Sequence, residues 1–93
     1  MNIVDRAYPV PFLLRRDWAS RTYRLENVSS ETLDGVSLTM HGGGLLGASS
    51  PALLQPAETL EVSIAGRHLA RDSILVVRWF RPDGVEYLWR VSF

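Results

Sequence analysis

The sequence predicts an all-β protein, an antiparallel β-sandwich of about seven strands that forms one domain over residues 1–93. Two observations support this class. Apolar and polar residues alternate with a period of two in most segments, which is typical of half-buried strands. Turn-forming residues separate these segments at short, regular intervals, as they do in sandwiches. The one helix candidate, residues 65–72, is too short to change the class.

The chain is expected to begin with an edge strand over residues 7–14. Pro9 and Pro11 are tolerated at a sheet edge because an edge strand need not donate every backbone N–H. The sequence Tyr-Arg-Leu-Glu of residues 23–26 then alternates between apolar and charged side chains. It predicts a second, half-buried strand.

Polar residues dominate residues 27–35 and predict a turn that Gly35 closes. Alternation resumes over residues 36–41 and predicts a third strand. That strand is expected to end at the three successive glycines of residues 42–44, because glycine weakens a strand interior.

An irregular crossing is expected over residues 45–58, where Pro51 and Pro56 interrupt the pattern. Leu53 and Leu54 are expected to anchor this crossing to the core. Strict alternation returns over residues 59–65 and predicts another strand.

The last two strands, residues 73–81 and 85–93, are rich in β-branched and aromatic residues and are the strongest strand predictions. Between them, Arg-Pro-Asp-Gly-Val fits a type I turn followed by a glycine with positive φ. A three-residue hairpin loop with a bulge at Gly84 fixes the register of the hairpin. The expected pairs are Arg81 with Val85, Phe80 with Glu86, Trp79 with Tyr87, Arg78 with Leu88, Val77 with Trp89 and Val76 with Arg90.

This register gives the hairpin two unlike faces. One face carries only large apolar residues and is expected to form a wall of the core. Its members are Leu75, Val77, Trp79, Val85, Tyr87, Trp89, Val91 and Phe93. The other face mixes apolar centres with charged neighbours, as protein-binding patches do. The candidate interaction patch on it consists of Val76, Arg78, Phe80, Glu86, Leu88 and Arg90. The alternative is that the charged side chains or another segment cover its apolar atoms.

Composition argues against several classes of function. Ten basic and ten acidic residues cancel, so the chain lacks the basic excess expected of a nucleic-acid binder. The absence of cysteine excludes disulfides, thiolate metal sites and a cysteine nucleophile. No window approaches the roughly 18 apolar residues of a membrane span. No signal peptide is recognisable, so a cytoplasmic location is expected if Met1 is the native start.

Short motifs that suggest chemistry lack the context they need. The sequence His-Gly-Gly-Gly of residues 41–44 matches the oxyanion segment of lipases, but the nucleophile elbow is missing. Residues 42–47 match a dinucleotide fingerprint, but no helix is expected to follow. His41 and His68 are too few for a metal site, and the Asn27 glycosylation sequon is expected to be a polar turn. We therefore expect no catalytic residue, no cofactor, no metal and no evident small-molecule site.

Two stretches resemble known families. Residues 23–38, with Asn-Val-Ser before a short polar turn, and the strand entry Leu-Gln-Pro-Ala-Glu-Thr-Leu at residues 54–60 are similar to bacterial immunoglobulin-like and fibronectin-like domains. This resemblance implies an immunoglobulin-like sandwich that serves as a spacer, adhesion or accessory binding module.

A second resemblance is to the chagasin-like inhibitors of cysteine peptidases, which use a glycine-rich loop and an Arg-Pro-aromatic loop. Gly43 and the Arg81-Pro82-Asp83 turn are the corresponding loop tips, although Asp83 stands where the inhibitors have an aromatic residue.

We therefore expect a non-catalytic protein-interaction or structural module that binds a protein partner or a second copy of itself. A loop-tip peptidase inhibitor is the alternative. A small hydrolase using His41 with Ser49 or Ser50 is a remote third reading.

Overall fold

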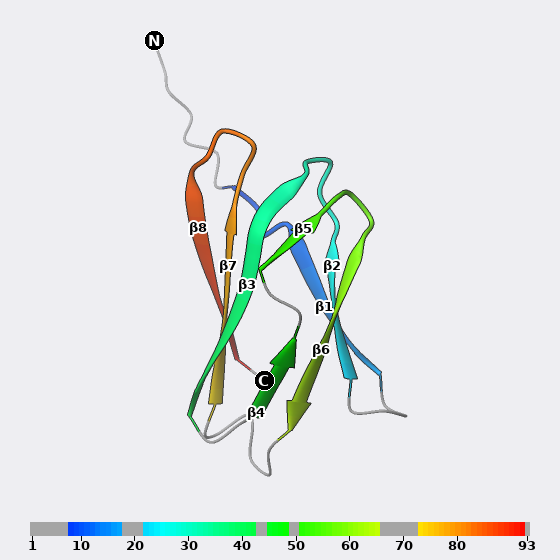
Figure 1. The fold of residues 1–93 in the computed structure, drawn as a ribbon, viewed down its shortest axis with the longest axis vertical. Helices are drawn as coiled ribbons and strands as arrows, with labels where there is room; N and C mark the ends of the chain where they lie inside the picture. Colours follow the sequence, from blue (N-terminus) through cyan, green and yellow to red (C-terminus); the bar gives the residue numbers. More distant parts are fainter. Residues whose placement is uncertain (1–7, 18–21, 43–44, 49–50, 66–72, 93) are drawn as a thin grey trace.

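The computed structural model describes residues 8–17, 22–42, 45–48, 51–65 and 73–92 (Figure 1). Within these ranges the chain forms eight strands in two four-stranded antiparallel sheets and no helix, which confirms the predicted all-β class. The first sheet has the order β1-β2-β6-β4 and the second has the order β5-β3-β7-β8. The strands are β1 (Phe12–Asp17), β2 (Thr22–Asn27), β3 (Leu33–Gly42), β4 (Leu45–Ala48), β5 (Ala52–Leu54), β6 (Thr59–Ala65), β7 (Ser73–Phe80) and β8 (Glu86–Ser92). An immunoglobulin-like topology stays a prediction.

The two central strands of the first sheet follow the alternation of the sequence. In β6, Leu60, Val62 and Ile64 are buried, and the residues between them are exposed. In β2, Tyr23 and Leu25 are buried. The strands predicted over residues 23–26 and 59–65 are therefore confirmed.

Three expectations about strand bounds are wrong. The first strand is β1, which begins at Phe12 after both prolines, because proline cannot donate to the ladder. The predicted crossing over residues 45–58 contains β4 and β5, which are only four and three residues long and too short to show alternation. The predicted turn over residues 27–35 ends early, because β3 begins at Leu33. The helix candidate, residues 65–72, lies almost wholly outside the described residues.

Gly35 marks a bulge inside β3. The register between β3 and β7 shifts between Asp34 and Ser37. Gly35 has a φ of +54°, a conformation that residues with a Cβ adopt at a cost. A Cβ built there would lie 2.8 Å from the ring of Phe80. Glycine is therefore required at this position for two reasons: the positive φ, and the Phe80 ring that lies over it.

The core lies between the two sheets. Trp79 of β7 is 2% exposed and contacts Phe12 of β1 edge to face, with ring centroids 5.0 Å apart. Leu25 and Val62 from the first sheet and Val36 from the second are fully buried in the same cluster. Since this cluster draws on both sheets, it joins them into one sandwich.

Candidate functional site

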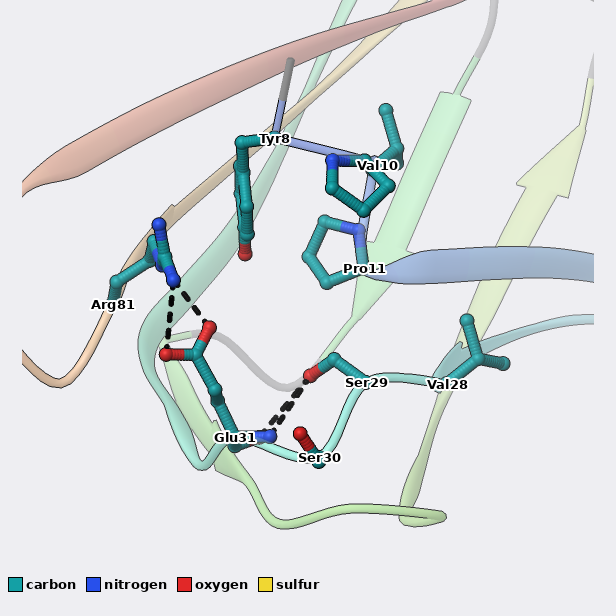
Figure 2. Close-up of a pocket in the computed structure, with 9 residues that line it drawn as sticks. Tyr8, Val10, Pro11, Val28, Ser29, Ser30, Glu31 and Arg81 are labelled. Carbon is teal, nitrogen blue, oxygen red and sulfur yellow. Dashed lines mark hydrogen bonds and ion pairs between the residues drawn. The ribbon is translucent and has the colours of Figure 1, made fainter. Parts of the chain in front are cut away.

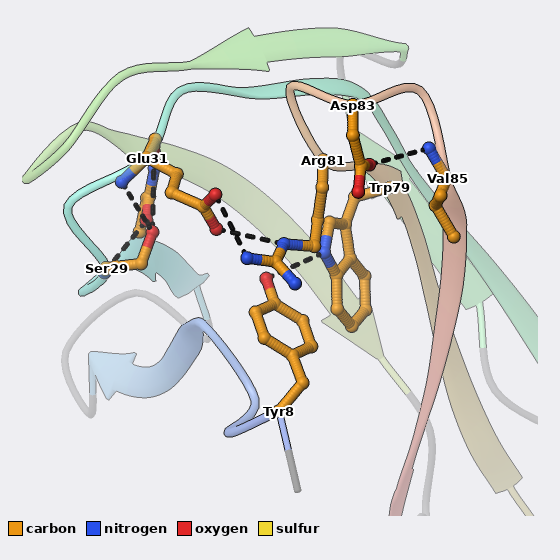
Figure 3. A network of polar contacts seen from close by, with 8 residues as sticks. Tyr8, Ser29, Glu31, Trp79, Arg81, Asp83 and Val85 are labelled. Atoms are coloured by element: carbon orange, nitrogen blue, oxygen red, sulfur yellow. Dashed lines mark hydrogen bonds and ion pairs between the residues drawn. The ribbon is translucent and has the colours of Figure 1, made fainter. Parts of the chain in front are cut away.

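The β7–β8 hairpin has the geometry that its turn residues predict. The backbone N–H of Gly84 donates to the carbonyl of Arg81 (2.8 Å), and the N–H of Arg81 donates to the carbonyl of Val85 (3.0 Å). Gly84 has a φ of +84°. The Asp83 carboxylate accepts a hydrogen bond from the N–H of Val85 (2.9 Å; Figure 3). All five predicted strand pairs, from Phe80 with Glu86 to Val76 with Arg90, are present, so the register is confirmed.

The inner face of the hairpin is buried only on β7. Leu75, Val77 and Trp79 are buried, as expected. The β8 members are less covered, since Tyr87, Trp89 and Val91 only pack against the margin of the core. Val85 is 48% exposed, so its assignment to the core is wrong. Phe93 lies outside the described residues. The physical reason is position: β8 is the edge strand of its sheet, and Val85 lies in the loop that precedes it.

The outer face of the same hairpin carries the predicted patch, which we call the outer patch: Val76, Arg78, Phe80, Glu86, Leu88 and Arg90. Leu88 is 63% exposed, the largest exposure among the large apolar residues that the structure describes. Arg78 forms an ion pair with Glu86 across the strands (Nε to Oε2, 3.0 Å), and its guanidinium lies 5.6 Å from the centroid of the Phe80 ring. Val76 and Phe80 are half-buried. The six residues therefore form one continuous surface in which each cross-strand pair joins an apolar residue to a charged one.

A pocket of about 590 Å³ lies at the hairpin end of the sandwich (Figure 2). Its walls come from three segments far apart in the sequence: residues 8–11, residues 28–31 and Arg81. Arg81 donates to both oxygens of Glu31 (3.0 and 3.1 Å), and its guanidinium lies 4.1 Å from the ring centroid of Tyr8. The hydrogen bond with Glu31 raises the pKa of Arg81 above its ordinary value, so the guanidinium of Arg81 stays protonated.

Sequence reasoning missed this pocket, because no local pattern links Tyr8, Glu31 and Arg81. The cation and the carboxylate of its wall already satisfy each other (Figure 3). The Nε1–H of Trp79 points to the hydroxyl of Tyr8 across a long contact of 3.4 Å, which ties the same wall to the core. The polar groups of the pocket thus serve the fold.

Asn27 is a fully buried polar residue near this pocket. Its Nδ2 donates to the carbonyls of Glu31 (2.8 Å) and Leu54 (3.0 Å). Its Oδ1 accepts from the backbone N–H (3.0 Å) and the hydroxyl (2.7 Å) of Ser29. Both halves of the amide are therefore occupied in the folded chain, and Asn27 holds the turn that follows β2.

The strand ends that adjoin the two predicted loop tips lie at opposite ends of the second sheet. Gly42 pairs with Ser73 at the start of β7, whereas Phe80, which precedes the Arg81-Pro82-Asp83 turn, pairs with Asp34 at the other end. Gly43 itself lies outside the described residues, as do His68, Ser49 and Ser50. His41 is exposed on β3 and pairs with Ile74. The described residues therefore do not bring the two sets of tips together.

The described residues contain no group of three or more histidine, cysteine, aspartate or glutamate residues placed to hold a metal ion. They also contain no helix with the length and apolar character needed to cross a membrane.

Comparison of the chain with protein-family models, curated proteins and solved structures gave no match.

Proposed function

We propose that this chain is a non-catalytic protein-interaction domain and that its contact surface is the outer patch. The observation that carries the proposal is the exposure of Leu88, which is 63% on the outer face of a regular hairpin. A leucine at this position does not serve the core. Its neighbours also fit an interface, because exposed apolar side chains beside arginine are typical of protein-binding surfaces.

Order in the patch supports the proposal. The Arg78–Glu86 ion pair and the contact of Arg78 with the Phe80 ring hold the charged side chains beside the apolar ones without covering Leu88. The hairpin register is fixed by its turn, so the patch is presented on a rigid scaffold. A surface with this order before binding loses less side-chain entropy when it meets a partner.

Site-specific photo-cross-linking in the cells that make the protein tests this proposal. A photoreactive amino acid replaces Leu88 in one variant. In the control variant it replaces Leu13, an exposed leucine on β1 in the other sheet. We expect discrete protein adducts from position 88 that position 13 does not give. Equal labelling at both positions, or none at 88, would contradict an interaction through the outer patch.

The peptidase-inhibitor alternative gains no support from the described residues. Its two loop tips would have to enter one cleft, but Gly42 and Arg81 are separated by the length of β7. A titration against a papain-like enzyme tests the alternative directly, and inhibition at micromolar protein would favour it over the outer patch.

A further inference from the structure

β8 ends its sheet with one backbone edge that pairs with no other described strand (Figure 1). The strand is seven residues long, contains no proline and pairs with β7 without a register shift. A regular, open edge of this length presents a row of unpaired N–H and C=O groups that favours pairing with another strand.

The turn determines which residues face the open edge. The carbonyl of Val85 accepts from the N–H of Arg81, so this carbonyl points toward β7. In an antiparallel ladder this direction alternates along the strand. Tyr87 and Trp89 therefore face β7, and Glu86, Leu88 and Arg90 direct their backbone N–H and C=O groups outward. These three are also the β8 members of the outer patch.

The three outward residues of one β8 strand are complementary to the same three residues of a second, antiparallel copy. When two antiparallel copies of β8 meet with a two-fold axis at Leu88, Leu88 lies opposite Leu88, and Glu86 lies opposite Arg90 on both sides of the axis. We propose that a second copy of this chain is the partner of the outer patch and binds by this edge-to-edge β8 pairing. The inference rests on the proposed function, since it names the partner of the same surface.

The charges select this register over its neighbours. Moving the axis by two residues places Glu86 opposite Glu86 or Arg90 opposite Arg90, and like charges directly opposite each other destabilise a strand pair. Moving it by one residue places Leu88 opposite a charged side chain. Only the axis at Leu88 joins two leucines and two ion pairs at once.

The side chains in one copy leave these partners available. Among the described residues, Arg90 forms no ion pair, and Glu86 uses its Oε2 for Arg78. The Oε1 of Glu86 remains for the Arg90 guanidinium of the second copy. Pairing would join two sheets into one of eight strands with the order β5-β3-β7-β8-β8-β7-β3-β5.

Charge reversal with light scattering after size exclusion tests the pairing, over protein concentrations from micromolar to millimolar. The wild-type chain is expected to shift from monomer to dimer. E86R places arginine opposite arginine, and R90E places glutamate opposite glutamate. Because two pairs change in each dimer, either variant alone should raise the dissociation constant about tenfold or more.

An equimolar mixture of E86R and R90E is the decisive sample. In the mixed pair, both charges of one copy are positive and both of the other are negative, so the dimer should return to near wild-type affinity. The double variant E86R/R90E should also dimerise with itself. Leu88→Glu should remain monomeric, and circular dichroism of every variant confirms that it is folded.

Three outcomes would overturn the inference. The wild-type chain could stay monomeric at every concentration, or the dissociation constant could be unchanged in both single variants. The third is that the two single variants do not dimerise when they are mixed. Adducts of a different protein at position 88, together with a monomeric chain, would leave the proposed interaction function standing and remove the second copy as its partner.

Discussion

Two regions of the sandwich use polar residues in opposite ways. At the hairpin end, Asn27, Ser29, Glu31 and Arg81 bond to one another and to the backbone, and no buried side-chain polar atom of the described residues lacks a partner. On the outer face of β8, Arg90 has no ionic partner among these residues and Leu88 is exposed. The polar groups of the first region therefore stabilise the fold, whereas the side chains of the second region remain available to a partner. The contrast predicts where substitutions damage stability and where they do not.

The largest effect is expected at Asn27. Asn27→Ala removes both Nδ2 donors, which leaves the carbonyls of Glu31 and Leu54 without these bonds, and it also removes the acceptor for Ser29. Because each buried group left unpaired costs about 1–3 kcal/mol, the free energy of unfolding should fall by about 3 kcal/mol. Urea denaturation measures it, with exposed Ser30→Ala as the control from the same turn. A loss as small as that of Ser30→Ala would show that water replaces the Asn27 amide.

Gly35→Ala should cost about 2 kcal/mol, because the new Cβ meets a positive φ and the Phe80 ring together. The two causes can be separated in a double-mutant cycle with Phe80→Leu. We expect Phe80→Leu to remove the share of the stability loss that comes from the clash with the ring, and to leave the share that comes from the positive φ. Additive losses would mean that Phe80 moves aside freely, and that the outer patch is less rigid than its contacts suggest.

A smaller change of opposite sign is expected at Ala57. Its φ of +70° occurs in the turn where the N–H of Glu58 donates to the carbonyl of Gln55 (3.0 Å). Because Pro56 and a positive φ at the next residue are the features of a type II turn, glycine suits position 57 better than alanine. Ala57→Gly should raise the free energy of unfolding by about 0.5–1 kcal/mol. A neutral or lower value from thermal unfolding would contradict the assigned turn.

The smallest effect on stability is expected at Leu88, although its effect on association should be large. An exposed strand residue outside any network usually changes the free energy of unfolding by less than about 0.5 kcal/mol. Leu88→Glu should therefore unfold near the wild-type midpoint in dilute protein, where pairing adds no stability. A fall as large as that of Gly35→Ala would place Leu88 in the core and end the contrast between the two regions.

The sequence predicted best where local chemistry determines geometry. The Pro82-Asp83-Gly84 turn fixed the hairpin register, so the outer patch followed from it residue by residue. It predicted less well where position decides burial: Val85 is apolar and bonds to Arg81 in the expected register, yet it is exposed where the chain leaves the turn, just before the edge strand β8.

Contacts between distant segments had no counterpart in the sequence. Tyr8 and Arg81 meet only through folding, and β5 is too short to show a period. The role of Asn27 was recognisable only as a polar turn, since its partners Glu31 and Leu54 are fixed by the tertiary structure.

Hydrogen exchange of the β8 backbone amides tests the central claim most directly, because it separates the two edges of one strand. The amides of Tyr87 and Trp89 face β7 and should be protected at every concentration. Those of Glu86, Leu88 and Arg90 face the open edge and should become protected only as concentration rises and copies pair. Fast exchange at these three positions at all concentrations would contradict the pairing of β8 with a second copy.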